Sequence, residues 1–203
     1  TPSINAITGD KLTAFAPNTV GIPYYKGEDS FAMEICKQLF DLSKLFQNIT
    51  DTEIVNESFM AFAKAEIAYR SEMPEYEDKE LTPTTILQDT IDTCLLIARR
   101  DTNKTEPYKT QFSDLNTGIR AFGGNFLMSG NFRIEDAVIA SARVAHLAAK
   151  LLVGDLSPIQ YYEGEDVMKL TIANETYAYL NKLKKQPDKS SYYYWYHTTK
   201  LLK

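Results

Sequence analysis

Histidine and cysteine are both scarce in this 203-residue sequence, with two of each: His146, His197, Cys36 and Cys94. Neither histidine has a glutamate three residues before it, which excludes the Glu-x-x-His pairs of a di-iron helical bundle. The clustered Cys and His of a structural zinc site are also missing, as are the Gly-x-Ser-x-Gly and Gly-Lys-Ser/Thr motifs of hydrolases and phosphate loops. We therefore expect no metal, no cofactor and no catalytic residues, and we favour a non-catalytic protein over an enzyme.

Long apolar runs are missing as well. None approaches the roughly 20 residues that a helix needs to cross a bilayer, and no signal peptide is recognisable, so we expect no membrane span. The net charge is −5 with both signs mixed along the chain, which disfavours a general nucleic-acid binder but leaves room for a locally basic groove. The cations that would serve such a groove are Arg99, Arg100, Arg120, Arg133 and Arg143.

Two further features bear on where the protein works. The cysteines fall on apolar faces of expected helices, so burial as small hydrophobic residues is favoured, and one disulfide between those helices is the alternative. The sequence also contains N-x-S/T sequons, which lean weakly toward an extracellular, surface or virion location. They lie at Asn48, Asn56, Asn103 and Asn174.

The stretch from Arg133 to Asp155 has the strongest helical pattern in the chain. Its apolar residues cover almost the whole circumference of a helix, which predicts a position in the middle of a bundle. Gly154 suits the position after the helix C-terminus. A narrow polar stripe remains where Asp136, Arg143 and Lys150 recur every seven residues, and we favour a solvated stripe over a buried ion pair or a functional site.

The N-terminal residues 1–28 have no helical period and contain three prolines and three glycines. This pattern predicts a non-helical arm. Within the arm, residues 4–15 fit a short hairpin around Gly9-Asp10. Two placements are open, because the arm can pack on its own helical body or lie on a neighbouring molecule.

Further helices are expected at residues 30–48, 51–71, 83–100 and 166–185, with a weaker one at 111–122 and a turn or short helix at 157–162. Thr50 to Glu53 has the spacing of a capping box, and Thr82-Pro83 supplies an N-cap followed by proline. Glycines predict two turns around Leu127-Met128, at Gly123, Gly124 and Gly130. The residues expected to point inward from the 51–71 helix are Val55, Phe59, Phe62, Ala63 and Ile67.

Residues 186–203 form a tail with five consecutive aromatic residues. We favour a helix slightly over a strand there. The tail either packs on its own bundle or forms a contact surface, because tyrosine and tryptophan are enriched at interfaces. The candidate binding or interface residues are Tyr24, Tyr25, Tyr161, Tyr162, Tyr192, Tyr193, Tyr194, Trp195 and Tyr196.

These patterns predict a mainly α fold: a helical bundle of five or six helices with a non-helical N-terminal arm (1–28), a helical domain (29–185) and an aromatic C-terminal tail (186–203). The favoured function is a structural subunit of coat, filament or scaffold type. It would self-assemble into a homo-oligomer through arm and tail, and one variant of this hypothesis encloses nucleic acid.

Two alternatives stay open. One is a secreted or surface binding module for a glycan, a peptide or a small molecule. The other is an enzyme built on carboxylates, since such groups can act as general acids and bases. The carboxylates available to it are Glu53 with Glu57, Asp89 with Asp92, and Glu163 with Glu165 and Asp166.

Overall fold

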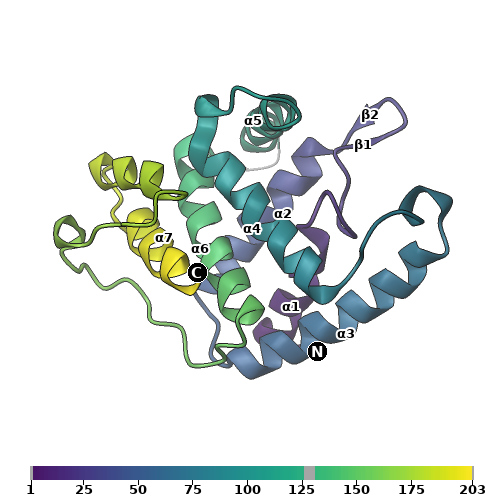
Figure 1. Ribbon diagram of the computed structural model, residues 1–203, viewed down its shortest axis with the longest axis horizontal. Helices are drawn as coiled ribbons and strands as arrows, with labels where there is room; N and C mark the ends of the chain where they lie inside the picture. The colour runs from purple at the N-terminus through teal and green to yellow at the C-terminus, as the bar shows by residue number, and fades with distance from the viewer. Residues whose placement is uncertain (1, 126–130, 203) are drawn as a thin grey trace.

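The computed structural model describes residues 2–125 and 131–202, which form a bundle of α-helices with very little strand (Figure 1). The α-helices are α1 (Ile4–Ala14), α2 (Ala32–Phe46), α3 (Thr52–Ser71), α4 (Pro83–Arg99), α5 (Tyr108–Asn125), α6 (Ile134–Leu152) and α7 (Ser190–Leu201). The strands β1 (Tyr25–Lys26) and β2 (Asp29–Ser30) pair antiparallel, and the 3-10 helices are η1 (Pro74–Tyr76), η2 (Arg100–Thr102), η3 (Val167–Lys169) and η4 (Ala178–Lys185). The predicted mainly α fold is confirmed.

Helix α6 runs through the middle of the bundle, where it packs against α4, α7 and α2 (Figure 1). All its alanines from Ala137 to Ala149 are buried, and small side chains allow neighbouring helices to approach closely. In the first turn Asp136 Oδ2 accepts a hydrogen bond from the Arg133 N–H at 2.8 Å, and Gly154 takes φ 72° beyond the last turn. The predicted central helix is therefore confirmed.

Helices α2, α3 and α4 lie where the apolar periodicity places them. Asp51 caps α3, because its Oδ1 accepts hydrogen bonds from two backbone N–H groups, and Thr82 caps α4 with Pro83 at the first helical position. One detail is wrong, since Phe62 does not point inward but is 44% exposed. Val55, Phe59 and Ala63 form the buried stripe, and Phe62 lies about 100° around the helix from Ala63.

The predicted non-helical arm is wrong over residues 4–14, which form α1. Ser3 caps this helix by accepting a hydrogen bond from the Ala6 N–H at 3.1 Å. The predicted hairpin around Gly9-Asp10 is wrong for the same reason. A small hairpin does form later in the arm, where β1 and β2 flank Gly27 at φ 61°.

Helix α1 packs against α3 and α2 of its own chain. Gly9 faces α3 so closely that a Cβ on it would lie 2.6 Å from the Phe59 backbone nitrogen and also against the Val55 carbonyl oxygen. The glycine that suggested a turn is thus the contact point of two helices. Residues 4–14 of the arm pack in cis.

Helix α5 is longer than the predicted 111–122 segment. Its Gly118 stands against the Ala32 backbone, which allows α5 to pack closely on α2. Gly123 and Gly124 continue the helix and do not form a turn. The rest of the two turns predicted around Leu127-Met128 falls on residues 126–130, outside the described ranges.

The predicted helix over residues 166–185 is wrong, because only η3 and η4 form there. Asn181 explains the break. Its Oδ1 accepts a hydrogen bond from the Ile172 N–H at 3.1 Å and its Nδ2 donates one to the Ile172 carbonyl at 2.9 Å. A side chain therefore satisfies backbone groups that a continuous helix would pair internally.

The tail forms α7, which packs against α6 (Figure 1). The preference for helix over strand is correct. Tyr192 and Trp195 are fully buried, and Tyr193 and Tyr194 are buried as well. The aromatic run is thus a large part of the core around α6, and its burial stabilises the fold by about 2 kcal/mol or more for each ring.

Candidate functional site

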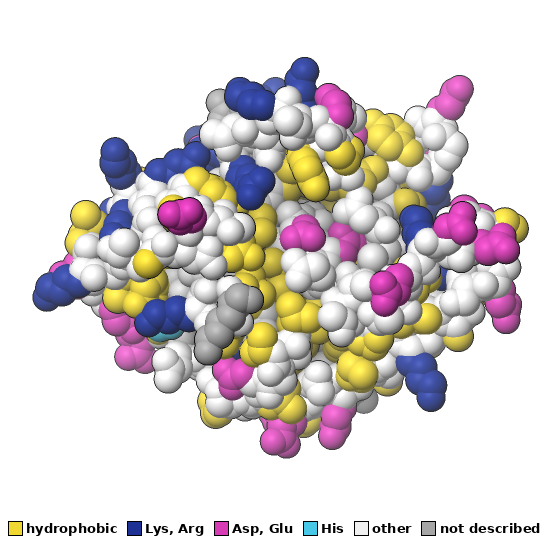
Figure 2. Space-filling model, in the orientation of Figure 1, with side chains coloured by type: hydrophobic (Ala, Val, Ile, Leu, Met, Phe, Trp, Pro, Cys, Tyr) yellow, Lys and Arg dark blue, Asp and Glu magenta, His cyan; other side chains and the backbone are white. Residues whose placement is uncertain are grey.

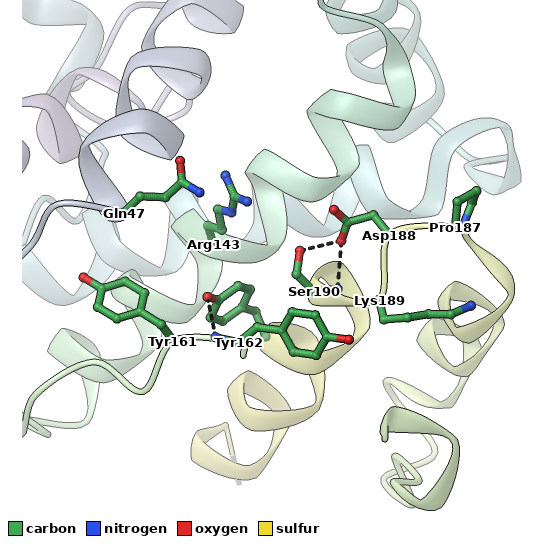
Figure 3. Close-up of a pocket in the computed structure, with 9 residues that line it drawn as sticks. Gln47, Arg143, Tyr161, Tyr162, Pro187, Asp188, Lys189 and Ser190 are labelled. Atoms are coloured by element: carbon green, nitrogen blue, oxygen red, sulfur yellow. Dashed lines mark hydrogen bonds between the residues drawn. The ribbon is translucent and has the colours of Figure 1, made fainter. Parts of the chain in front are cut away.

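A cleft of about 490 Å³ opens where the end of α2, the middle of α6, the loop after α6 and the start of α7 meet (Figure 3). We call it the Arg143 cleft. Its walls bring together side chains far apart in sequence, among them three of the predicted binding tyrosines. The lining residues are Gln47, Arg143, Tyr161, Tyr162, Pro187, Asp188, Lys189, Ser190 and Tyr194.

Arg143 projects from α6 toward Gln47 at the end of α2 (Figure 3). Its Nη1 donates a hydrogen bond to Ser43 Oγ at 3.2 Å, while its Nε is shielded from solvent and has no hydrogen-bond partner. Within residues 2–125 and 131–202 it forms no ion pair. A shielded, unpaired donor costs about 1–3 kcal/mol, and more when the group is charged. The cleft therefore contains a cation with unused hydrogen-bonding capacity.

The tyrosines form the lower wall of the cleft in Figure 3. The Tyr161 hydroxyl lies 3.0 Å from the Phe46 carbonyl and 2.8 Å from that of Ile49, and the Tyr194 hydroxyl accepts from the Tyr162 N–H at 3.1 Å. Burial raises the pKa of all three phenols, although the Tyr162 N–H and Arg143 oppose the rise at Tyr194. The phenols are neutral at physiological pH, so they supply rings and dipoles but no counter-ion.

The start of α7 forms the opposite wall (Figure 3). Asp188 Oδ1 accepts hydrogen bonds from the Ser190 N–H at 2.8 Å and from Ser190 Oγ at 2.5 Å. Lys189 turns its ammonium group toward the η4 end, where it donates to the carbonyls of Lys184 and Gln186. Asp188 is thus engaged at the start of α7 and Lys189 at the end of η4. Arg143 is the cation that faces the cleft.

The other predicted binding residues do not join this site. Tyr24 and Tyr25 lie at the β1 hairpin, where the Tyr25 hydroxyl donates to Asp114 at 3.0 Å. The core contains Tyr192, Tyr193 and Trp195, while Tyr196 is half-buried on α7. In this fold the buried three serve the packing of α7, so they offer little surface to a partner.

No protein-family model matches the chain, and no curated protein or solved structure is significantly similar to it. In the described ranges, no three His, Cys, Asp or Glu side chains are grouped as a metal ion would need. None of the helices described combines the length and the apolar character that crossing a bilayer requires. The side chains and cavities of the chain itself are therefore the basis for proposing a function.

A second cavity, of about 400 Å³, lies between residues 18–19, α4 and α5 and contains Asp89 and Asp92. Burial raises the pKa of both carboxyl groups. Asp89 accepts hydrogen bonds from the Asn18 N–H and amide and from the Thr19 hydroxyl, at 2.7–2.9 Å. These bonds anchor residues 18–19 to α4, which gives Asp89 a structural role.

The other carboxylate sets are less suited to acid catalysis. Glu53 and Glu57 are exposed on α3. Hydrogen bonds from backbone N–H groups lower the pKa of Glu165, whereas a general acid needs a raised one. Neither set therefore favours the enzyme hypothesis.

The two histidines meet between α6 and α7, with ring centroids 6.4 Å apart, beside a cavity of about 200 Å³. His146 is 7% exposed, and burial, followed by His197 and Lys150, lowers its pKa to about 3. His146 is thus a core histidine. Lys150 is 4% exposed and pairs with Asp155 at 2.6 Å, so the solvated stripe expected on α6 is wrong at this position.

The cysteines and one sequon are also placed. Cys36 and Cys94 are buried free thiols, as predicted, and the alternative disulfide does not form. Burial raises the pKa of both thiols, which makes them poor nucleophiles. Asn103 is 8% exposed and its amide donates to the Leu96 and Arg100 carbonyls, so the folded chain presents no free amide there for glycosylation.

The sequence predicts Tyr161 and Tyr162 as binding residues, whereas it gives Arg143 only as one of five cations for a basic groove and as part of a polar stripe, not as the centre of a cleft. One signal was available, because Arg143 interrupts a helix that is apolar on almost every side. Ser43, Gln47 and Asp188 gave no signal. They come from α2 and from the start of α7, and only the packing of these helices on α6 brings them to the cleft.

Proposed function

We propose that this chain is a non-catalytic binding protein that holds a phosphate-bearing ligand with a flat ring in the Arg143 cleft. The unpaired guanidinium group of Arg143 carries this proposal. The volume of about 490 Å³ is in the range of small-molecule sites. This corresponds to the binding-module hypothesis, and three of its predicted residues, Tyr161, Tyr162 and Tyr194, line the cleft.

The hydrogen bonding of Arg143 favours an oxyanion. A guanidinium group presents Nε–H and one Nη2–H along a single edge, which matches two oxygens of a phosphate or carboxylate. Ser43 accepts from Nη1, and the Nε of this edge has no hydrogen-bond partner among the described residues. An anion that reaches the edge after a small side-chain rotation would satisfy the Nε donor and the charge together.

The rings around Arg143 favour a phosphate that carries an aromatic group. The Tyr162 ring is half-buried and lies 5.4 Å from the Tyr193 ring, centroid to centroid. A fixed ring with one accessible side can stack with a planar ligand at about 1–3 kcal/mol. Ser190 and Gln47 add polar groups at the rim. A nucleoside monophosphate has both parts, the dianion and the ring.

The test uses adenosine 5′-monophosphate and adenosine, which differ only in the phosphate, in calorimetric titrations of the whole chain. Loss of a charge-assisted hydrogen bond costs about 1.5–3 kcal/mol, so we expect the monophosphate to bind about 10–100-fold more tightly. In Arg143→Gln this preference should fall to nearly one. Arg143→Lys should recover only part of it, because lysine keeps the charge and loses the two-donor edge.

The matched control is Lys64→Gln, which removes one positive charge from the exposed side of α3 and should keep the preference. Thermal unfolding of each variant establishes that it is folded before titration. Equal affinity for both ligands in the unmodified chain, or a preference that survives in Arg143→Gln, would overturn the proposal.

A second candidate function is self-assembly. The surface that supports it lies on α3 and not on the predicted arm and tail. An exposed apolar stripe follows α3, where Ile54 is 38%, Phe62 44% and Tyr69 59% exposed, with the exposed Ala61 and Ala65 between them. These positions recur at helical spacing on one face. The stripe has a large residue at each end, so an antiparallel second copy would place Ile54 of one chain near Tyr69 of the other.

Light scattering tests this candidate. Phe62→Ser leaves the core untouched, because Phe62 points away from it, so we expect an unchanged melting temperature and a fall in average mass toward the monomer. The control is Met60→Ser, which removes an exposed apolar residue from a different face of α3. An unmodified chain that is monomeric at high concentration, or a Phe62→Ser chain of unchanged mass, would rule out this interface.

A further inference from the structure

Further cavities that share lining residues with the Arg143 cleft follow it along the bundle. A cavity of about 190 Å³ shares Arg143 and Asp188 with it, and a third, of about 560 Å³, shares Asn131 and Phe132 with the second. The series therefore passes from the start of α7 along α2 and α6 to the end of α5. We call this series the basic groove.

Five cations line the basic groove; Lys189 donates to backbone carbonyls at the η4 end, and the other four are Arg143, Lys44, Arg133 and Arg120. None of them forms an ion pair within residues 2–125 and 131–202. Lys44, Arg133 and Arg120 are exposed, and the Lys44 ammonium lies 5.4 Å from the centroid of the Phe40 ring. At least one such cation stands in each of the three cavities.

The acidic residues along the groove are engaged with the protein. Asp188 accepts from Ser190, and Asp136 Oδ2 accepts from the Arg133 N–H at 2.8 Å. Glu135 pairs with Arg100 at 3.3 Å. Only Glu135 has a cationic partner, because the donors to Asp188 and Asp136 are neutral. The cations that line the groove outnumber these three carboxylates, so the net charge that a ligand meets is positive.

Aromatic rings lie along the same path. The half-buried Tyr161 and Tyr162 line its first cavity and the half-buried Phe40 lines the second. Tyr194 and Phe132 beside them are buried, and the Phe40 and Phe132 ring centroids lie 5.4 Å apart. Proteins that bind single-stranded nucleic acid commonly combine cations with aromatic rings, because phosphates need cations and unpaired bases need stacking partners.

We infer that the basic groove binds a single-stranded nucleic acid, with one phosphate on Arg143 and the following ones on Lys44, Arg133 and Arg120. This inference rests on the proposed function, since it extends the phosphate site of the Arg143 cleft. A duplex fits less well, because its bases are already stacked on each other and cannot reach rings inside a cleft.

The net charge of −5 does not oppose this inference, because part of the acidic charge lies away from the groove. Figure 2 shows acidic side chains gathered around the far end of α3, while the basic side chains at the top and left stand among further acidic ones. The loop after α3 alone contains five acidic residues: Glu72, Glu75, Glu77, Asp78 and Glu80. Fields of exposed charges fall off over about 8–10 Å at physiological salt, so a strand in the groove responds mainly to the local cations.

Fluorescence anisotropy tests the inference with a labelled oligouridylate of about 12 nucleotides, a length within the range that single-strand grooves cover. We expect it to bind at least about tenfold more tightly than adenosine 5′-monophosphate, with a slope of log K against log salt near −3, about −0.7 for each of four phosphates. Oligothymidylate of the same length shows whether the 2′-hydroxyl contributes. A duplex of the same length should bind more weakly than either strand.

Charge-removing variants separate the groove from the cleft. Arg120→Gln and Arg133→Gln should each weaken oligonucleotide binding by about fivefold and reduce the salt slope by about 0.7, while leaving monophosphate binding unchanged. Arg143→Gln should weaken both. Lys64→Gln should change neither.

The outcomes distinguish the two proposals. If the monophosphate binds through Arg143 but the oligonucleotide binds no more tightly, or if Arg120→Gln and Arg133→Gln behave like Lys64→Gln, the groove is refuted and the cleft stands. Duplex binding as tight as that of the single strand also refutes the groove. If neither ligand binds at low salt, both proposals fail.

Discussion

The contact between α1 and α3 gives a sharp prediction about Gly9. In the fold a Cβ at this position would meet the backbone of α3, at 2.6 Å from the Phe59 nitrogen and against the Val55 oxygen. Backbone atoms in the middle of a helix cannot move aside as the end of a flexible side chain can. Gly9→Ala should therefore push α1 away from α3.

Two effects of opposite sign set the magnitude. Replacing glycine by alanine inside a helix stabilises it by up to about 1 kcal/mol. Overpacking at a tight contact costs about 1–3 kcal/mol, and a clash with backbone belongs at the upper end of that range. We expect a net destabilisation of about 1–2 kcal/mol.

Gly124→Ala is the matched control. Gly124 also lies within a helix, α5, but a Cβ there meets no atom of the described residues within 4 Å. The same substitution should therefore stabilise the protein by about 0.5–1 kcal/mol. The free energy of unfolding from urea titrations measures both changes. If Gly9→Ala is as stable as the unmodified chain, α1 does not pack on α3 as described.

Two predictions concern buried charge. Asp155→Asn leaves the Lys150 ammonium, 4% exposed, without its carboxylate, so it should reduce the free energy of unfolding by about 2–3 kcal/mol in urea titrations; the same loss in Lys150→Met, which leaves no buried ammonium, would show that the uncompensated charge is not the cause. The pKa of His146 is lowered to about 3, below the ordinary value of 6.5, so its contribution to stability is complete above pH 6.5 and falls as pH drops toward 3. His146→Gln should therefore flatten the fall in melting temperature between pH 7 and pH 5, and an unchanged slope would contradict this.

The parts of the fold that the sequence predicts well are those in which one local signal dominates. Helices α4 and α6 have a cap, an apolar period and a stop, and all of these agree. The arm was misjudged because Gly9 has two physical meanings, a turn residue or a point of close helix contact. Only the position of α3, which is set by tertiary packing, decides between them.

The stretch over residues 166–185 shows a different limit. Its apolar residues have helical spacing, yet Asn181 binds the backbone of Ile172 at both its N–H and its carbonyl. Two hydrogen bonds from one amide side chain take the place of the helical backbone pairing. Nothing in the local sequence distinguishes such an asparagine from an exposed one.

The candidate site shows the same division. Tyrosines beside a loop are visible as binding candidates, because their residue type alone indicates contact surface. The decisive property of Arg143 is that no carboxylate of the described residues pairs with it. This property depends on which side chains the fold places around Arg143. The aromatic tail illustrates the converse, since residues of interface type were needed to bury α7 against α6.

The most direct test of this account is the preference for adenosine 5′-monophosphate over adenosine, measured by calorimetry in the unmodified chain and in Arg143→Gln. We predict a preference of about 10–100-fold that falls to nearly one in the variant, because Arg143 is the cation that meets the phosphate. A preference of the same size in both proteins would show that the phosphate binds elsewhere and would contradict the account.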